Sequence, residues 1–256
     1  MTKRKEAASK CAEWYAQILR LTAFQSPESI IESTNWWNDV IGSAPDERTL
    51  KPKIGGSRES GSFEGGRLIL DVAVNRVDWL LVAIEDIAAT SEAISTIGPF
   101  NSIIDKFVPL VDRWSKLATC PSLNRLAFGA VLLCPVETKS AGYRILSSYL
   151  PDVIIDPEGS SDLFYQINRP RNSKGEIRGL INRLSKWSVI TMQIAMIGPQ
   201  GPVATVKSKE NRACHLELDI STPIEYSETI EQKLISSVFN ELVDLGKEIA
   251  AKGDIR

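Results

Sequence analysis

Apolar residues recur along the chain at two spacings, which together predict a mixture of helices and strands. Near the N-terminus they are three or four positions apart, which predicts an amphipathic helix over residues 4–22. The apolar face of this helix would consist of Ala7, Cys11, Trp14, Ile18 and Leu21. A second helix is expected to begin near Ser26-Pro27-Glu28 and to end at Gly42, because serine caps helices and proline is favoured in the first turn.

Residues 43–66 have a different character, with little apolar content and several glycines. They predict a loop or a loosely held hairpin region. The next residues, 67–74, alternate between apolar and other side chains, and 77–84 follow after a short Asn75-Arg76 break. This pattern predicts two paired antiparallel strands.

The rest of the chain predicts further helices and strands. A helix is expected at 99–117, where Pro109 should kink or restart it, and the best-defined helix runs from a capping Ser227 to Gly253. The remaining expected elements are a buried strand at 125–136, a short helix at 143–150 and strands at 163–169, 186–197 and 214–220.

Because strands and helices do not alternate strictly, the order favours an α+β fold over a doubly wound one. We expect a mostly antiparallel sheet flanked by amphipathic helices, including the long C-terminal one. The expected organisation is an N-terminal helical segment (1–42), a glycine-rich loop (43–66) and an α+β core domain (67–256).

Composition and charge exclude several classes of protein. The chain has 256 residues, is 43% hydrophobic and carries a formal net charge of −2, which argues against coating nucleic acid by bulk electrostatics. The longest uncharged run, 187–206, is interrupted by Gly-Pro pairs and is too weakly apolar for a membrane helix. The basic N-terminus lacks the apolar stretch of a secretory signal, so a cytoplasmic protein is expected.

The four cysteines, Cys11, Cys120, Cys134 and Cys214, are far apart in the sequence, and His215 is the single histidine. No zinc-binding spacing is present, and we expect reduced thiols, no metal site and no cofactor.

Two short motifs suggest enzymes. Gly56 to Gly61 has the spacing of a phosphate-binding loop but lacks the lysine and hydroxyl that would follow, so no nucleotide site is expected. Glu137-Thr138-Lys139 resembles half of a magnesium-dependent nuclease core. Asp71 or Asp78 on a preceding strand could supply the missing carboxylate.

Two other polar groups have simpler explanations. Asp152, Asp156, Glu158 and Asp162 could bind a cation through oxygen atoms, but they lack the regular spacing of a calcium loop and favour a solvated turn. His215, Glu217 and Asp219 share one face of a strand, where the histidine could act as a base but no nucleophile can be assigned. No catalytic residue is therefore assigned.

The stretch 169–186 is strongly basic, and its cations with two adjacent tryptophans make the candidate binding residues. These are Arg169, Arg171, Lys174, Arg178, Arg183, Lys186, Trp36 and Trp37. Arginines near aromatic residues can bind phosphates and unpaired bases, so nucleic acid is one possible ligand. A solvated loop, a protein partner, or contact with the acidic C-terminal helix are the alternatives. Two adjacent tryptophans cannot both face one core, so one could form a contact surface, or both could lie at a core margin.

The segments DLFYQINRPR (162–171), INRLSKWSV (181–189) and LELDIS (216–221) resemble a sporadically distributed family of uncharacterised bacterial α+β proteins. The resemblance covers mainly the C-terminal hundred residues. It implies a role in bacterial antiviral defence or near mobile elements, and it implies no catalytic residues.

The sequence thus favours a non-enzymatic accessory protein that binds a protein partner or forms a homodimer or other homo-oligomer. The alternatives are a magnesium-dependent nuclease and a nucleic-acid-binding protein using the 169–186 stretch. The binding hypothesis predicts that glutamate at positions 169, 171 and 183 abolishes partner binding with little change in melting temperature.

Overall fold

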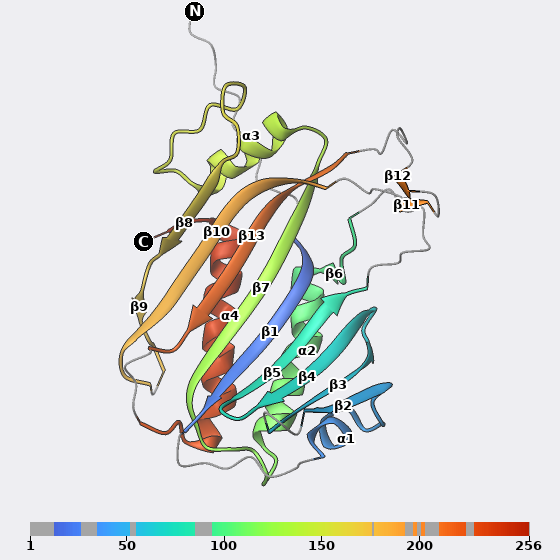
Figure 1. Cartoon of the computed structure of the whole chain (residues 1–256). Helices are drawn as coiled ribbons and strands as arrows, with labels where there is room; N and C mark the ends of the chain where they lie inside the picture. Colours follow the sequence, from blue (N-terminus) through green and yellow to red (C-terminus); the bar gives the residue numbers. More distant parts are fainter. Residues whose placement is uncertain are drawn as a thin grey trace, which may run out of the picture.

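The chain is built around one large antiparallel sheet with helices on one side, as a computed structural model shows (Figure 1). The structure describes residues 13–26, 35–51, 55–84, 94–175, 177–192, 197–198, 201–202, 210–223 and 228–255. The strand order is β2-β3-β4-β5-β1-β7-β13-β10-β8, with β6 paired to β1 and β9 paired to β10. This is a mixed α+β protein dominated by its sheet.

The elements have the following bounds. The strands of the first half are β1 (Tyr15–Gln25), β2 (Glu47–Lys51), β3 (Gly56–Phe63), β4 (Gly66–Ala73), β5 (Arg76–Ala83) and β6 (Gly98–Pro99). Those of the second half are β7 (Leu123–Val136), β8 (Phe164–Asn168), β9 (Arg171–Asn172), β10 (Leu180–Met192), β11 (Ile197–Gly198), β12 (Gly201–Pro202) and β13 (Asn211–Ser221). The helices are α1 (Trp36–Ile41), α2 (Phe100–Ser115), α3 (Lys139–Tyr149) and α4 (Ile235–Lys252), the last preceded by a 3₁₀ turn at Gln232–Leu234.

The topology repeats itself around the central strand pair β1–β7. In the first half, β1 lies beside β5, followed outward by β4 and β3, and α2 follows β5 in the chain. In the second half, β7 lies beside β13, followed outward by β10 and β8, and α4 follows β13. Because β1 and β7 are antiparallel, the two halves are related by an approximate two-fold axis between them.

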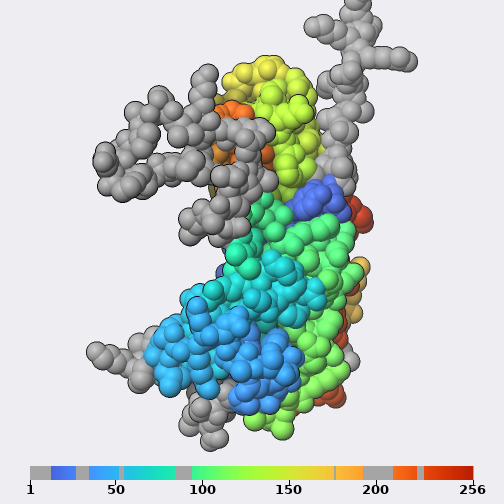
Figure 2. Space-filling model, turned by 90° about the vertical axis from the view of Figure 1, so that its right-hand side faces the viewer, coloured from blue at the N-terminus to red at the C-terminus, as the bar shows by residue number. Residues whose placement is uncertain are grey.

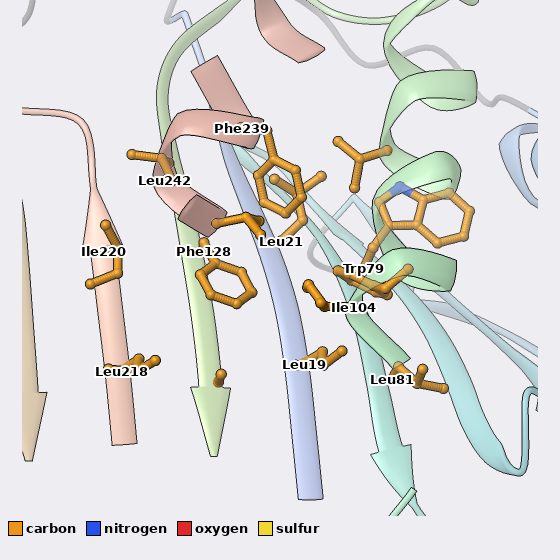
Figure 3. Close-up of a cluster of buried hydrophobic side chains, with 14 of the residues drawn as sticks. Leu19, Leu21, Trp79, Leu81, Ile104, Phe128, Leu218, Ile220, Phe239 and Leu242 are labelled. Carbon is orange, nitrogen blue, oxygen red and sulfur yellow. The ribbon is translucent and has the colours of Figure 1, made fainter. Parts of the chain in front are cut away.

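The main core lies between the sheet and the two long helices. Side chains from β1, β5, β7 and β13 point toward α2 and α4, as the labelled leucines and aromatic residues of Figure 3 show. Phe128 of β7 meets Phe239 of α4 edge-on, with ring centroids 6.0 Å apart. Since side chains of a strand alternate between faces, this packing leaves every second residue of the central strands on the opposite face.

The helix expected at residues 4–22 is wrong for its described part, which forms strand β1. A β-bulge between Ala16 and Ile18 places Ala16 and Leu19 on the same buried face although they are three residues apart. That spacing imitates a helix, whereas the following Leu21 and Ala23 alternate as in any strand. Residues 4–12 lie outside the described part of the chain.

For residues 43–66 the loop alternative is wrong and the hairpin alternative is confirmed, because β2 and β3 pair as antiparallel strands and extend the sheet there. Its glycines reflect close packing: a Cβ at Gly61 would lie 2.9 Å from the Trp37 ring. A strand selected for glycine and small polar residues has the composition of a loop, which explains the error. The described strands of this range, β1, β2 and β3, therefore belong to the main sheet.

Other expectations are confirmed. Strands β4 and β5 pair as a hairpin, β7, β8 and β13 lie where strands were expected, and a helix ends at Gly42. The helix at 99–117 runs through Pro109 as α2 without restarting, and α4 forms the expected C-terminal helix. Strand β10 begins at Leu180, six residues earlier than expected, so part of the basic stretch is a strand. Ser227, the expected cap, lies outside the described residues.

No helix among the described residues is both long and apolar enough to cross a membrane. The expectation of four thiols is wrong for Cys134, which is disulfide-bonded. Cys120 and Cys214 are free, and burial raises the pKa of each thiol to about 12. Cys11 lies outside the described residues.

Candidate binding surfaces

The arginines of the basic stretch face the protein's own C-terminal helix. Arg169 forms a two-pronged interaction with the buried Asp254 just beyond α4, with a distance of 2.8 Å from Nη2 to Oδ2. The hydroxyl of Tyr165 donates to the same carboxylate at 2.8 Å. Asp254 thus holds β8 and the segment after it against the end of α4.

Arg171 and Arg183 share a second carboxylate, Glu248 of α4. Arg171 donates to Glu248, and Arg183 Nη2 lies 3.6 Å from it. The Arg183 side chain is only 2% exposed and points from β10 into the helix-covered side of the sheet. Arg169, Arg171 and Arg183 of the basic stretch therefore make contacts inside the protein and do not form a free surface.

The pKa values of the two carboxylates fit this arrangement. Burial raises the pKa of Asp254, but hydrogen bonds from Arg169 and Tyr165 and the nearby arginine charges outweigh it, so the pKa falls below its usual value. For Glu248, burial likewise raises the pKa, but hydrogen bonds from Lys252 and Arg171 and the charges of these two residues outweigh burial. The pKa of Glu248 therefore also falls below its usual value. Both groups therefore remain charged in the folded protein at neutral pH.

The other cations of the stretch are more accessible. Lys186 pairs with Glu217 at 2.7 Å on the face away from the helices, and Lys174 and Arg178 are exposed. The loop carrying Lys174 borders a groove of about 790 Å³ against α4, with both acids and bases on its walls. Glu241 of this groove accepts from the Lys174 backbone N–H at 2.6 Å, so the groove has no single sign of charge.

Trp36 and Trp37 are both buried, at 1% and 2% exposure. Trp36 packs edge-on against Trp114 and donates to Thr119 at 3.0 Å, whereas Trp37 stacks on Trp79. Both are the first residues of the short helix α1 and belong to the same hydrophobic core, so the expectation that they could not both face one core is wrong. The structure therefore leaves neither ring as a surface contact.

The residues of the possible nuclease core are not brought together. Asp78 of β5 lies opposite Thr22 of β1, and Thr22 lies opposite Ala127 of β7. Ala127 comes ten residues before Glu137 in the chain. At about 3.3 Å per residue this separates them by about 30 Å along the strands. Asp71 is the neighbour of Asp78 in the sheet and is equally far from Glu137.

These groups also have other partners. Asp71 pairs with Lys51 at 3.1 Å, Lys139 pairs with Asp162 at 3.3 Å, and Thr138 caps α3 by accepting from the Ala141 N–H. Among the described residues, no group of three or more histidines, cysteines or carboxylates could hold a metal ion. The acidic cluster is a turn in which Glu158 pairs with Arg144.

His215 lies with Glu217 and Asp219 on the face of the sheet away from the helices, as the alternation predicted. Burial lowers its pKa, partly offset by Glu217, and its Nδ1 is 3.4 Å from the Ser188 hydroxyl. This is a cross-strand contact at the long end of hydrogen bonding, without a carboxylate oriented on the ring.

A further candidate surface, the face of the sheet away from the helices, was not predicted from the sequence. All four described helices pack on the other face: α1 through Trp37, α2 and α4 through the main core, and α3 through Gly142 against Val189. In Figure 2, which shows the sheet nearly edge-on, this open face lies on the left and the long helices on the right.

The centre of the open face is apolar and only half-buried. Ile18 of β1 lies opposite Val131 of β7 on one side and Val82 of β5 on the other. Leu80 is the neighbouring residue of β5 that points to the same face as Val82. Around them lie the ion pairs Arg67–Glu47, Arg76–Asp78 and Lys186–Glu217. We call this set of half-buried apolar residues, Ile18, Leu80, Val82 and Val131, the apolar centre.

Two further arginines lie on the open face, Arg20 beside the apolar centre and Arg125 six residues along β7 from Val131. Arg20 of β1 and Arg125 of β7 form no ion pair among the described residues, and the Nε of each is buried without a hydrogen-bond acceptor there. The sequence contains a signal for Arg20, because Arg20 and Thr22 alternate with the apolar Leu19, Leu21 and Ala23. Interpreting the segment as a helix concealed this alternation.

The sequence matches no protein-family model, and a search of curated proteins finds no match. The resemblance to the sporadically distributed bacterial family therefore stays a prediction, and the arrangement of these residues is what a functional interpretation must rest on.

Proposed function

We propose that this protein works by binding a partner on the open face of its sheet, and not by catalysis. The observation that carries the proposal is the apolar centre, a group of half-buried apolar residues on the central strands with charged residues around it. A dry apolar middle with a polar rim is the usual anatomy of a protein recognition surface. The candidate acids and lysine of the nuclease alternative are separated and paired elsewhere, which supports binding over that reading.

The sequence-based hypothesis of a protein partner or a homodimer, and of an accessory role in bacterial defence, remains a prediction. What changes is the surface: Arg169, Arg171 and Arg183 are engaged with Asp254 and Glu248, so we move the proposed contact from the basic stretch to the apolar centre.

The test uses a photo-crosslinking amino acid at Val131, compared with the same group at the exposed Asn240 on α4. In cells that normally make the protein, we expect a covalent adduct from position 131 and none from position 240. Crosslinking from position 240 alone, or equally from both, would contradict the proposal. The identity of the adduct, protein or nucleic acid, reports the class of partner.

A further inference from the structure

Two arginines of the open face, Arg20 and Arg125, lie on the neighbouring strands β1 and β7 without a carboxylate partner among the described residues. Thr22 of β1 lies opposite Ala127 of β7. Arg20 is two residues before Thr22, and Arg125 is two residues before Ala127. The two arginines therefore lie on the same face of the sheet, on neighbouring strands and on either side of the Thr22–Ala127 pair.

Each arginine lies against a residue of the neighbouring strand, and Arg125 Nη2 also donates to Ser221 Oγ of β13 at 3.2 Å. Arg20 lies over Gly129, where an added Cβ would be 3.1 Å from both Nε and Nη2 of the guanidinium. Arg125 lies over the ring of Phe24, with Cζ 5.0 Å from the ring centroid. Gly129 and Phe24 are the residues directly opposite Arg20 and Arg125 in the strand register, so the pattern is reciprocal.

Both side chains carry charge that the described protein does not neutralise. A guanidinium stays protonated at any physiological pH, and a buried N–H without an acceptor destabilises the protein. Arg76, which also lies against Phe24 at 5.9 Å, is paired with Asp78. Asp219, one strand beyond Gly129, is a second carboxylate, so the arginines at positions 20, 76 and 125 exceed the nearby carboxylates by one charge.

The distance between the two positions suits an extended ligand. From Gly129, opposite Arg20, to Arg125 is four residues of β7, or about 13 Å at about 3.3 Å per residue. A small anion could contact one guanidinium at a time, whereas a chain with repeated negative charges could reach both.

We infer that Arg20 and Arg125 bind the phosphates of a single-stranded nucleic acid that lies across β1 and β7 of the open face. This inference rests on the proposed function of that face. Planar guanidinium groups match phosphate oxygens in pairs, and an open antiparallel sheet with an aromatic residue is a known platform for unpaired bases. Phe24 and the apolar centre provide apolar surface next to the phosphate contacts.

An acidic protein segment is the competing ligand. Carboxylates on flexible side chains could also pair with the two arginines. They carry no flat ring, however, that would cover the half-buried residues Ile18, Leu80 and Val82 next to Arg20. The phosphates and bases of one strand supply both kinds of contact, which is why we favour nucleic acid.

The binding experiment measures fluorescence anisotropy of a labelled 12-nucleotide oligouridylate with the full-length chain over a range of salt concentrations. We expect salt-sensitive binding that weakens at least tenfold in the double variant Arg20→Gln/Arg125→Gln. The slope of log affinity against log salt should fall by about 1.4, since each phosphate contact with a single strand contributes about 0.7. Circular dichroism confirms that the variant is folded.

Two further variants guard against a trivial explanation. Arg113→Gln/Arg144→Gln removes the same charge from exposed positions on α2 and α3, on the helix side of the sheet, and should bind like the wild type. Gly129→Ala keeps both arginines but places a methyl group against the Arg20 guanidinium, and should weaken binding severalfold. It serves in place of the double variant if that variant does not fold.

The proposal is overturned if the wild type does not bind the oligonucleotide at low salt, or if the double variant binds as tightly as the charge-matched control. A labelled poly-glutamate peptide is measured in parallel. Peptide binding that depends on Arg20 and Arg125, without oligonucleotide binding, would refute nucleic acid while leaving the open face as a binding surface. The absence of a crosslink from Val131 would instead remove the proposed function itself.

Discussion

The arginines that face α4 and those on the open face have opposite surroundings. Arg169, Arg171 and Arg183 each lie within reach of Asp254 or Glu248, whereas Arg20 and Arg125 have no carboxylate partner among the described residues. The first group is dense in sequence and neutralised in space. The second is separated by 105 positions in the sequence, is brought together by the pairing of β1 with β7, and keeps its charge. Density of charge along a chain is therefore a poor guide to free charge on its surface.

The largest effect is expected from reversing the charge of the α4-facing group. Arg169→Glu/Arg171→Glu/Arg183→Glu places three acids against Asp254 and Glu248, with position 183 almost fully buried. Loss of one partner of a buried ion pair costs about 3–5 kcal/mol, which approaches the whole stability of many domains. The triple variant should be unfolded, or greatly destabilised, in thermal melts followed by circular dichroism.

This outcome is the opposite of the expectation drawn from the sequence, which was an unchanged melting temperature. Arg113→Glu, at an exposed position of α2, is the control and should change the unfolding free energy by no more than about 0.5 kcal/mol. If the triple variant melts like the wild type, the contacts with α4 do not stabilise the fold and the comparison fails.

The second effect is a pH dependence of stability carried by Asp254 and Glu248. Their pKa values are lower in the folded state than in an unfolded chain, so the stabilisation is present above about pH 4 and is lost as the pH falls through the folded values. Urea unfolding between pH 7 and pH 3 should show a decreasing free energy of unfolding.

Asp254→Asn should flatten this pH dependence, because its side chain cannot ionise, and should also lower stability at pH 7. An equally steep loss in wild type and variant would mean that other carboxylates control the acid response.

The smallest effect is expected for the open face. Arg20→Gln and Arg125→Gln each remove a charge that has no carboxylate partner among the described residues, so the unfolding free energy should change by less than about 1 kcal/mol. The same urea titrations at pH 7 measure it. A loss above about 1 kcal/mol in either single variant would show that these arginines stabilise the sheet, and would remove the contrast with the α4-facing group.

The sequence predicted local structure well where one period continued without interruption. The apolar face of α4 and the alternation in β4 and β5 lead to the correct elements, because each segment buries one continuous side. The prediction failed at β1, where a bulge changed the spacing, and at β3, where packing against Trp37 demands glycine. Neither cause is visible before the neighbouring strand or ring is placed.

The candidate site was less predictable than the fold. The basic stretch was noticed because its charges are consecutive, and contact with the C-terminal helix was among the alternatives considered for it. Arg20 and Arg125 were not noticed, because each is a lone arginine in an apolar segment. Their relation depends on which strands are neighbours.

By itself, the sequence determined an α+β protein with a C-terminal amphipathic helix and antiparallel hairpins, since these follow from contacts between residues close in the chain. The tertiary structure alone decided that β1 and β7 lie side by side, that two similar halves meet there, and which arginines keep their charge. The physical reason is that pairing between distant strands and neutralisation of a charge are properties of residue pairs, and a linear pattern specifies only one member of each pair.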